Sequence, residues 1–184
     1  MARKKSRTKS KPSSRTSAKA KTRSKAKRAK AQRIRHIPAG YHSVTPYLAV
    51  RGAAAAIEFY KRVFGAKEKV RFPDGERIAH AEIDMGGSHV MLADEQPALN
   101  FVAPQPGGPS SVGIMLYVTD VDAAAERAVT AGSKVERPVT DQFYGDRLGT
   151  IVDPYGHRWY VATHVEDVSP AEMRKRMQAM KPQT

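Results

Sequence analysis

Apolar residues alternate with polar ones or recur at helical spacing through residues 41–94, and this pattern predicts five elements. Within residues 77–85 the alternation is strict: alanine, isoleucine and methionine occupy one face, whereas His80 and Glu82 occupy the other. This is the period of a β-strand. Residues 53–64 place their apolar residues at the spacing of an amphipathic helix. Further strands are predicted at 44–50, 67–72 and 88–94, so the order is β-α-β-β-β.

The same order of elements returns in residues 112–163. Asp120 fits the N-cap position of a helix whose valine and alanines keep helical spacing. The sequence Asp-Pro-Tyr-Gly at 153–156 predicts the turn of a hairpin. In the alignment of the two halves, Tyr47-Leu-Ala-Val50 corresponds to Met115-Leu-Tyr-Val118. Strands are predicted at 112–118, 135–139, 147–152 and 157–162.

This repeat predicts an α+β fold built from two tandem βαβββ modules. Each module would supply a sheet with one helix on its convex face, and together they would form a curved mixed sheet around a shared cavity. Ligand sites usually occupy such concave clefts. A linker rich in proline and glycine, residues 95–111, joins the modules. We expect a domain at 39–168 that contains modules 41–94 and 112–163.

The two ends of the chain lie outside the repeat. Residues 169–184 begin with Ser-Pro-Ala-Glu, a capping box with proline at the first helical position. Methionines then recur at helical spacing, which predicts a short amphipathic C-terminal helix. Residues 2–31 contain no aromatic or large aliphatic side chain, so they cannot bury enough apolar surface to fold. We expect residues 1–38 to form a disordered basic tail.

Charge is distributed very unevenly along the chain. The whole sequence has 32 Lys and Arg against 18 Asp and Glu, but residues 1–35 contain 16 of the basic residues and no acid. The remainder is therefore slightly acidic, and the net charge of +14 does not describe the folded surface. Such an arm can bind nucleic acid without sequence preference by releasing counterions. The alternatives are a solubilising extension, a mis-assigned start codon or a transit peptide.

Composition excludes several classes of site. The absence of cysteine excludes disulfides and thiolate catalysis. No apolar run approaches the ~18 residues of a transmembrane helix, and the N-terminus lacks the apolar region of a secretory signal. We therefore expect a cytoplasmic protein that does not bind membranes.

Several motifs carry a resemblance to a known family. The helix AIEFYKRVFGA, the strands HAEI and MLAD, and the closing segment YGDRLGTIVDPYGHRWYVATHVEDVSP resemble the vicinal oxygen chelate superfamily. This superfamily includes glyoxalase I, extradiol dioxygenases, and fosfomycin-resistance and bleomycin-binding proteins. The closing segment is most similar to the PhnB-like branch. The resemblance covers about residues 43–176, and it implies a homodimer and a glyoxalase-like lyase or isomerase if the chain is an enzyme.

The resemblance also locates the positions where metal-using members place their ligands. Those members carry His, Gln or Glu on the first and last strand of each module. Matching the motifs gives Thr45, Met91, Gly113 and Tyr160, none of which suits a divalent metal. The resemblance therefore implies no metal cofactor and a metal-free protein that binds a small molecule, with anions among the candidate ligands. A metal-dependent lyase, isomerase or dioxygenase, and a nucleic-acid-associated protein acting through the arm, are the alternatives.

Period-two alternation and the resemblance together place a set of residues at the cavity. His80 and Glu82 share a face, so they form either a general base or a structural ion pair. Arg147 either binds an anionic group of the ligand or braces the sheet by pairing with Asp146 or Glu82. His157 and Trp159 are interpreted as scaffold. The predicted ligand-binding residues are Tyr47, Met115, Tyr117, Phe143, Asp146, Arg147 and Tyr160.

Overall fold

A computed structural model describes residues 34–105 and 107–180, and the elements below belong to one compact unit that begins at Arg35. The predictions for the basic arm fall on residues 1–33 and lie outside the described residues. The first module consists of β1 (Tyr47–Val50), α1 (Ala53–Phe64), β2 (Lys67–Asp74), β3 (Arg77–Met85) and β4 (Ser88–Asp94). The second consists of β5 (Gly113–Tyr117), α2 (Val121–Thr130), β6 (Lys134–Asp141), β7 (Asp146–Val152) and β8 (Arg158–His164).

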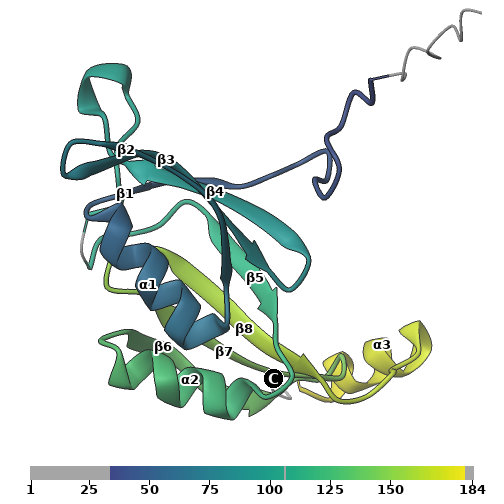
Figure 1. Cartoon of the computed structure of the whole chain (residues 1–184). Helices are drawn as coiled ribbons and strands as arrows, with labels where there is room; N and C mark the ends of the chain where they lie inside the picture. The colour runs from purple at the N-terminus through teal and green to yellow at the C-terminus, as the bar shows by residue number, and fades with distance from the viewer. Residues whose placement is uncertain (1–33, 106, 181–184) are drawn as a thin grey trace, which may run out of the picture. The chain divides into compact units, whose positions relative to one another are not determined.

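Each module forms a four-stranded mixed sheet of the same topology (Figure 1). The strand order is β1-β4-β3-β2 in the first sheet and β5-β8-β7-β6 in the second. In both, the first strand pairs in parallel with the last, and the remaining pairs are antiparallel. The predicted α+β fold of two βαβββ modules is therefore confirmed.

Several strand bounds differ from the predicted ones. β2 ends at Asp74, beyond the predicted residue 72, and so takes in Pro73. β6 ends at Asp141, beyond the predicted residue 139, and its Pro138 already lay within the predicted strand. Both are edge strands, where a residue without an N–H donor costs no hydrogen bond to a neighbouring strand. β1 begins at Tyr47 rather than at residue 44, directly after Pro46.

Side chains from both modules build one hydrophobic core. α1 and α2 lie next to each other (Figure 1), and the fully buried Trp159 of β8 packs against Tyr60 and Phe64 of α1. Trp159 is therefore core, as the sequence predicts. Because the helix of one module covers an aromatic side chain of the other, the two modules share their core.

A buried carboxylate, Asp153, joins the modules at the centre of this core. Its Oδ2 accepts hydrogen bonds from the Tyr60 hydroxyl at 2.8 Å and from Trp159 Nε1 at 2.9 Å. Its Oδ1 accepts from the backbone N–H groups of Tyr155 and His157. Burial alone would raise the pKa of Asp153, but the neighbouring His157 imidazole and the Trp159 and Tyr60 donors outweigh it, so the pKa lies below its usual value.

The helices begin at side chains that satisfy their free N–H groups. Asp120 caps α2 by accepting from the N–H of Ala123, as predicted. The backbone N–H groups of Gly52 and Ala53 at the start of α1 donate instead to Asp94, a residue of β4. This cap depends on a strand distant in the sequence, so the local pattern could not indicate it.

The C-terminal helix α3 (Pro170–Ala179) confirms the predicted helix and its cap, in which Ser169 Oγ accepts from the N–H of Glu172. No residue of α3 is buried. It is held by Arg176, which forms ion pairs with Glu166 at 2.7 Å and Glu172 at 3.2 Å. Within the described residues, none of the helices has both the length and the apolar character that a membrane span needs.

Candidate functional site

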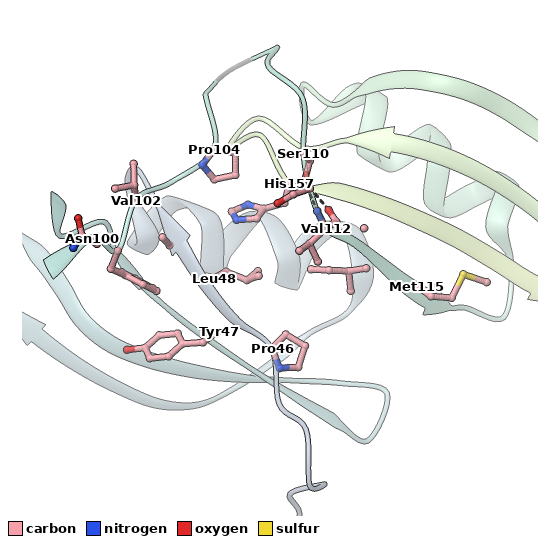
Figure 2. A pocket seen from close by; sticks show the side chains of 15 residues that line it. Pro46, Tyr47, Leu48, Asn100, Val102, Pro104, Ser110, Val112, Met115 and His157 are labelled. Carbon is pink, nitrogen blue, oxygen red and sulfur yellow. Dashed lines mark hydrogen bonds between the residues drawn. The ribbon is translucent and has the colours of Figure 1, made fainter.

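A cavity of about 700 Å³ lies where the first strands of the two modules approach each other (Figure 2). β1 and the residue before it contribute residues 46–49, and β5 and the residues before it contribute residues 110–115. Linker residues 100–102 and 104, together with His157, complete the wall. Its volume falls in the range of small-molecule sites, and its lining is mostly apolar, which is typical of them.

Tyr47 connects this cavity to a chain of polar side chains on the first sheet. Its hydroxyl lies 3.0 Å from His80 Nδ1, and His80 Nε2 lies 3.1 Å from Glu82 Oε1. The Tyr41 hydroxyl donates to the other carboxylate oxygen of Glu82. The sheet register explains the arrangement, because Tyr47 and Glu82 both pair with Met91 of β4, on its opposite sides.

The charges along this chain of residues fix the direction of its hydrogen bonds. The hydrogen bond from Tyr41 lowers the pKa of Glu82 despite burial, and His80 lowers it further. Conversely, the bond to Glu82 raises the pKa of Tyr41, which stays a neutral donor. An anionic Glu82 favours a proton on His80 Nε2, which leaves Nδ1 to accept from Tyr47. The Tyr47–His80–Glu82 chain can therefore carry a proton between the cavity and a carboxylate.

A second polar cluster occupies the other sheet. Tyr117 donates to Asp146 Oδ2 at 2.8 Å, and His164 lies between two carboxylates, with Nδ1 2.7 Å from Asp146 Oδ1 and Nε2 3.1 Å from Asp167 Oδ1. Asp146 itself is buried. Sequence analysis missed His164 because it ended the last strand at residue 162. Two-residue alternation from Tyr160 places His164 on the same face, so a longer strand would have found it.

The His164 cluster makes stability depend on pH. Hydrogen bonds to Asp146 and Asp167 raise the pKa of His164 above the ordinary 6.5. The folded state therefore holds this proton more tightly than the unfolded state, and the resulting stability is present below about pH 6.5 and lost as pH rises through the folded-state pKa. We expect the excess in Tm of wild type over His164→Gln to be largest near pH ~6 and absent by pH ~9. A difference in Tm that does not vary with pH would contradict this assignment.

The predicted ligand-binding residues lie in several different environments. Tyr47 and Met115 line the large cavity, while Met115 and Tyr117 line a neighbouring cavity of about 320 Å³. Phe143 packs edge-on against Tyr144. Tyr160 lies over Gly113 so closely that a Cβ there would meet its ring at 2.3 Å.

Arg147 has different partners from those the sequence suggested. Its guanidinium binds Asp122 of α2 through two hydrogen bonds of 2.7 and 2.8 Å, and Asp141 of β6 at 3.0 Å. It contacts neither Asp146 nor Glu82 through these bonds. Arg147 thus braces α2 against the second sheet, and its fork of donors is already engaged.

The positions of family metal ligands do not form a metal centre. Gly113 has no side chain and Tyr160 covers it, while Met91 lies beside Tyr47 in the sheet and Thr45 precedes β1. Across residues 34–105 and 107–180, no group of three or more His, Asp or Glu side chains could hold a metal ion. These residues do not fit a divalent metal.

Comparison with known proteins places this geometry in a family. The model of the Glyoxalase/Bleomycin resistance protein/Dioxygenase superfamily matches residues 33–161. An uncharacterized protein of Mycobacterium bovis is 40% identical over 140 residues, covering 73% of this chain and 91% of that protein. The crystal structure of TioX from Micromonospora sp. ML1 is 27% identical with a TM-score of 0.53, covering 70% of this chain and 100% of TioX. The PhnB protein from Bacillus cereus, 16% identical with a TM-score of 0.52 and coverages of 66% and 99%, shares the fold.

Proposed function

Because the chain belongs to the Glyoxalase/Bleomycin resistance protein/Dioxygenase superfamily, we propose that it binds a small molecule in the cavity between β1 and β5 without using a metal. The family resemblance seen in the sequence is confirmed, and the ligand-binding role is our inference from the cavity. The observation that carries it is a mostly apolar cavity of about 700 Å³ whose wall includes Tyr47 and Met115, two of the predicted ligand-binding residues.

We do not extend the expectation of an anionic ligand to this proposal. The expectation of an anion rested on Arg147, and two aspartates bind that guanidinium. The described residues that line the cavity include no lysine, arginine, aspartate or glutamate. An apolar wall of this kind favours uncharged ligands, because a charge would lose its hydration without gaining a partner.

Filling the cavity tests the proposal. Val112 lines the cavity and is 67% exposed, so Val112→Trp can occupy the space with little cost to folding. We expect the variant to bind the uncharged probe 2-methoxynaphthalene at least about tenfold more weakly than wild type in a fluorescence titration. Val129→Trp, at a half-exposed position of α2 that is not part of the wall, is the matched control. Unchanged affinity in Val112→Trp, or no binding by wild type, would refute the proposal.

We further propose that the chain forms a homodimer. Phe72 pairs with His80 across β2 and β3 and stacks on its ring, so it shares the face that carries Tyr47. Tyr47, Phe72 and Tyr117 are all exposed by 47% or more, and a second copy of the chain would cover such a surface. Light scattering after size exclusion should give twice the chain mass for wild type and the single mass for Phe72→Asp. A monomeric wild type would exclude the dimer.

The basic arm supports a separate proposal, that residues 1–35 bind nucleic acid. This rests on the sequence alone, through the 16 basic residues and the absence of acids. Full-length protein should be retained on duplex DNA at low salt, whereas residues 36–184 should not. Equal retention of the two proteins would contradict the proposal that the arm binds nucleic acid.

A further inference from the structure

The imidazole of His157 is a polar group in the wall of the large cavity. His157 follows the β7–β8 turn, is 8% exposed and lines the cavity. Figure 2 shows its ring between Pro104 and Leu48. The turn is fixed against the linker, because Gly156 has φ +92° and lies so close that a Cβ there would be 3.0 Å from Pro104 Cβ. Sequence analysis interpreted His157 as scaffold, but the fold places its ring at the cavity.

The hydrogen bonds of Asp153 leave His157 without a partner. All four bonds described above for that carboxylate come from other donors or from the His157 backbone. His157 Nδ1 is buried, has no hydrogen-bond partner among the described residues, and lies 3.7 Å from Asp153 Oδ2. A buried nitrogen left unpaired is costly, and in a native structure it calls for a specific explanation. The hydrogen bonds of the core therefore do not fully satisfy this ring.

The nearby carboxylate determines which ring nitrogen carries the proton. A negative charge beside Nδ1 favours the tautomer with its proton on Nδ1, since that N–H then points toward Asp153. Nε2 is then an acceptor with a free lone pair. The ring lies in the wall of the cavity and its side chain is 10% exposed, so we infer that Nε2, the nitrogen away from Asp153, faces the cavity.

The other polar side chains of the wall are already engaged or peripheral. The Tyr47 hydroxyl bonds His80, and Ser110 Oγ donates to the carbonyl of Val112. Leu48, Ile114 and the remaining aliphatic lining offer only van der Waals contact. Asn100 and Ser111 also belong to the wall, and both are exposed, so His157 is the one buried polar side chain among the described residues that a ligand here would meet.

We propose that His157 Nε2 is the specificity determinant of the cavity, and that the ligand is an uncharged, largely apolar molecule with a hydroxyl or N–H group that donates to it. The inference rests on the proposed ligand-binding function and adds the ligand class to it. An apolar pocket gives little discrimination by itself, whereas a fixed buried acceptor rejects analogues that lack the donor.

Two probes test the inference: 2-naphthol has a hydroxyl donor, and 2-methoxynaphthalene has a methoxy group in its place. Wild type should bind 2-naphthol about tenfold more tightly than 2-methoxynaphthalene, the difference expected of one hydrogen bond. In His157→Phe, which keeps an aromatic ring, the two affinities should become equal while that for 2-methoxynaphthalene is retained. His89→Phe is the matched control, because His89 Nδ1 is also buried and unpartnered but lines the smaller cavity. Its preference for 2-naphthol should equal that of wild type.

The outcomes separate this inference from the proposed function. If 2-methoxynaphthalene binds but 2-naphthol shows no advantage, or if the advantage survives in His157→Phe, the role of His157 is refuted and the cavity remains a binding site. Tighter binding of the anion 2-naphthoate would also refute the uncharged class. If no probe binds, both proposals fail. Long-range ¹H–¹⁵N spectra of wild type provide a test that needs no variant: a proton on Nε2 instead of Nδ1 would overturn the assignment.

Discussion

Replacing Asp153 with asparagine should lower the free energy of unfolding by about 3 kcal/mol, a large share of the stability of a domain this size. The carboxylate accepts two hydrogen bonds at each oxygen, including those of Tyr60 and Trp159. An amide turns one acceptor into a donor that faces other donors. Two buried groups, the tyrosine hydroxyl and the indole N–H, then lose their partner. Urea unfolding monitored by Trp159 fluorescence measures the loss.

The matched control for this substitution is Asp74→Asn, at an exposed position at the end of β2, where we expect a change within about 0.5 kcal/mol. The lowered pKa of Asp153 adds a pH signature. Its stabilising effect is present above the unfolded-state pKa of about 3.9 and is lost as pH falls through the folded-state value. The gap between wild type and Asp153→Asn should therefore narrow in acid. A loss below about 1 kcal/mol at neutral pH would show that the core tolerates an amide here.

Gly145→Ala should cost about 3 kcal/mol and release the chain that follows β8. Gly145 has φ +99°, and a Cβ there would lie 2.0 Å from the Glu166 carbonyl oxygen and 2.9 Å from Val168. Its own carbonyl accepts from the N–H groups of Val165 and Glu166. Since the clash is with backbone, a side-chain rotation cannot relieve it. We expect a lower urea midpoint together with faster proteolysis after residue 164.

Gly87→Ala separates the clash from the backbone strain. Gly87 has φ +92°, but nothing lies within 4 Å of a Cβ built there. Only the left-handed conformation is then penalised, at about 1 kcal/mol. If the two variants lost equal stability, the contact of Gly145 with the 166–168 segment would contribute nothing, and the proteolysis result would need another cause.

Most of the fold could be predicted from the sequence, because the patterns that indicate its helices and strands are local and occur in both modules. The alternation of residues 77–85 and the helical spacing of 53–64 predicted β3 and α1 with the observed bounds. Both modules supplied the same order, so each prediction supported the other. One error lies where neighbouring strands decide: β2 continues through Pro73, which an edge strand tolerates because no strand pairs on its outer side.

The site was harder to predict from the sequence than the fold, because its contacts join segments that are distant in the chain. Alternation put His80 and Glu82 on one face, and the structure brings them into contact. Alternation could not indicate that Tyr41, which lies before the first strand, contacts Glu82. It also could not indicate the partners of Arg147, which are Asp122 of α2 and Asp141 of β6. The position of His157 in the cavity wall could not be predicted for a related reason. Its neighbours in sequence form a turn, whereas its place in the cavity depends on the packing of that turn against the linker.

The bond from Tyr60 to Asp153 makes the two modules depend on each other for stability. Tyr60 belongs to the first module and Asp153 to the second, so a single module cannot supply both the carboxylate and all of its donors. A chain reduced to its second module would keep a buried charge and lose a donor, and one reduced to its first would lose the acceptor of a buried hydroxyl. Each module therefore depends on the other for the full set of hydrogen bonds at Asp153, and these buried groups oppose the unfolding of one module without the other.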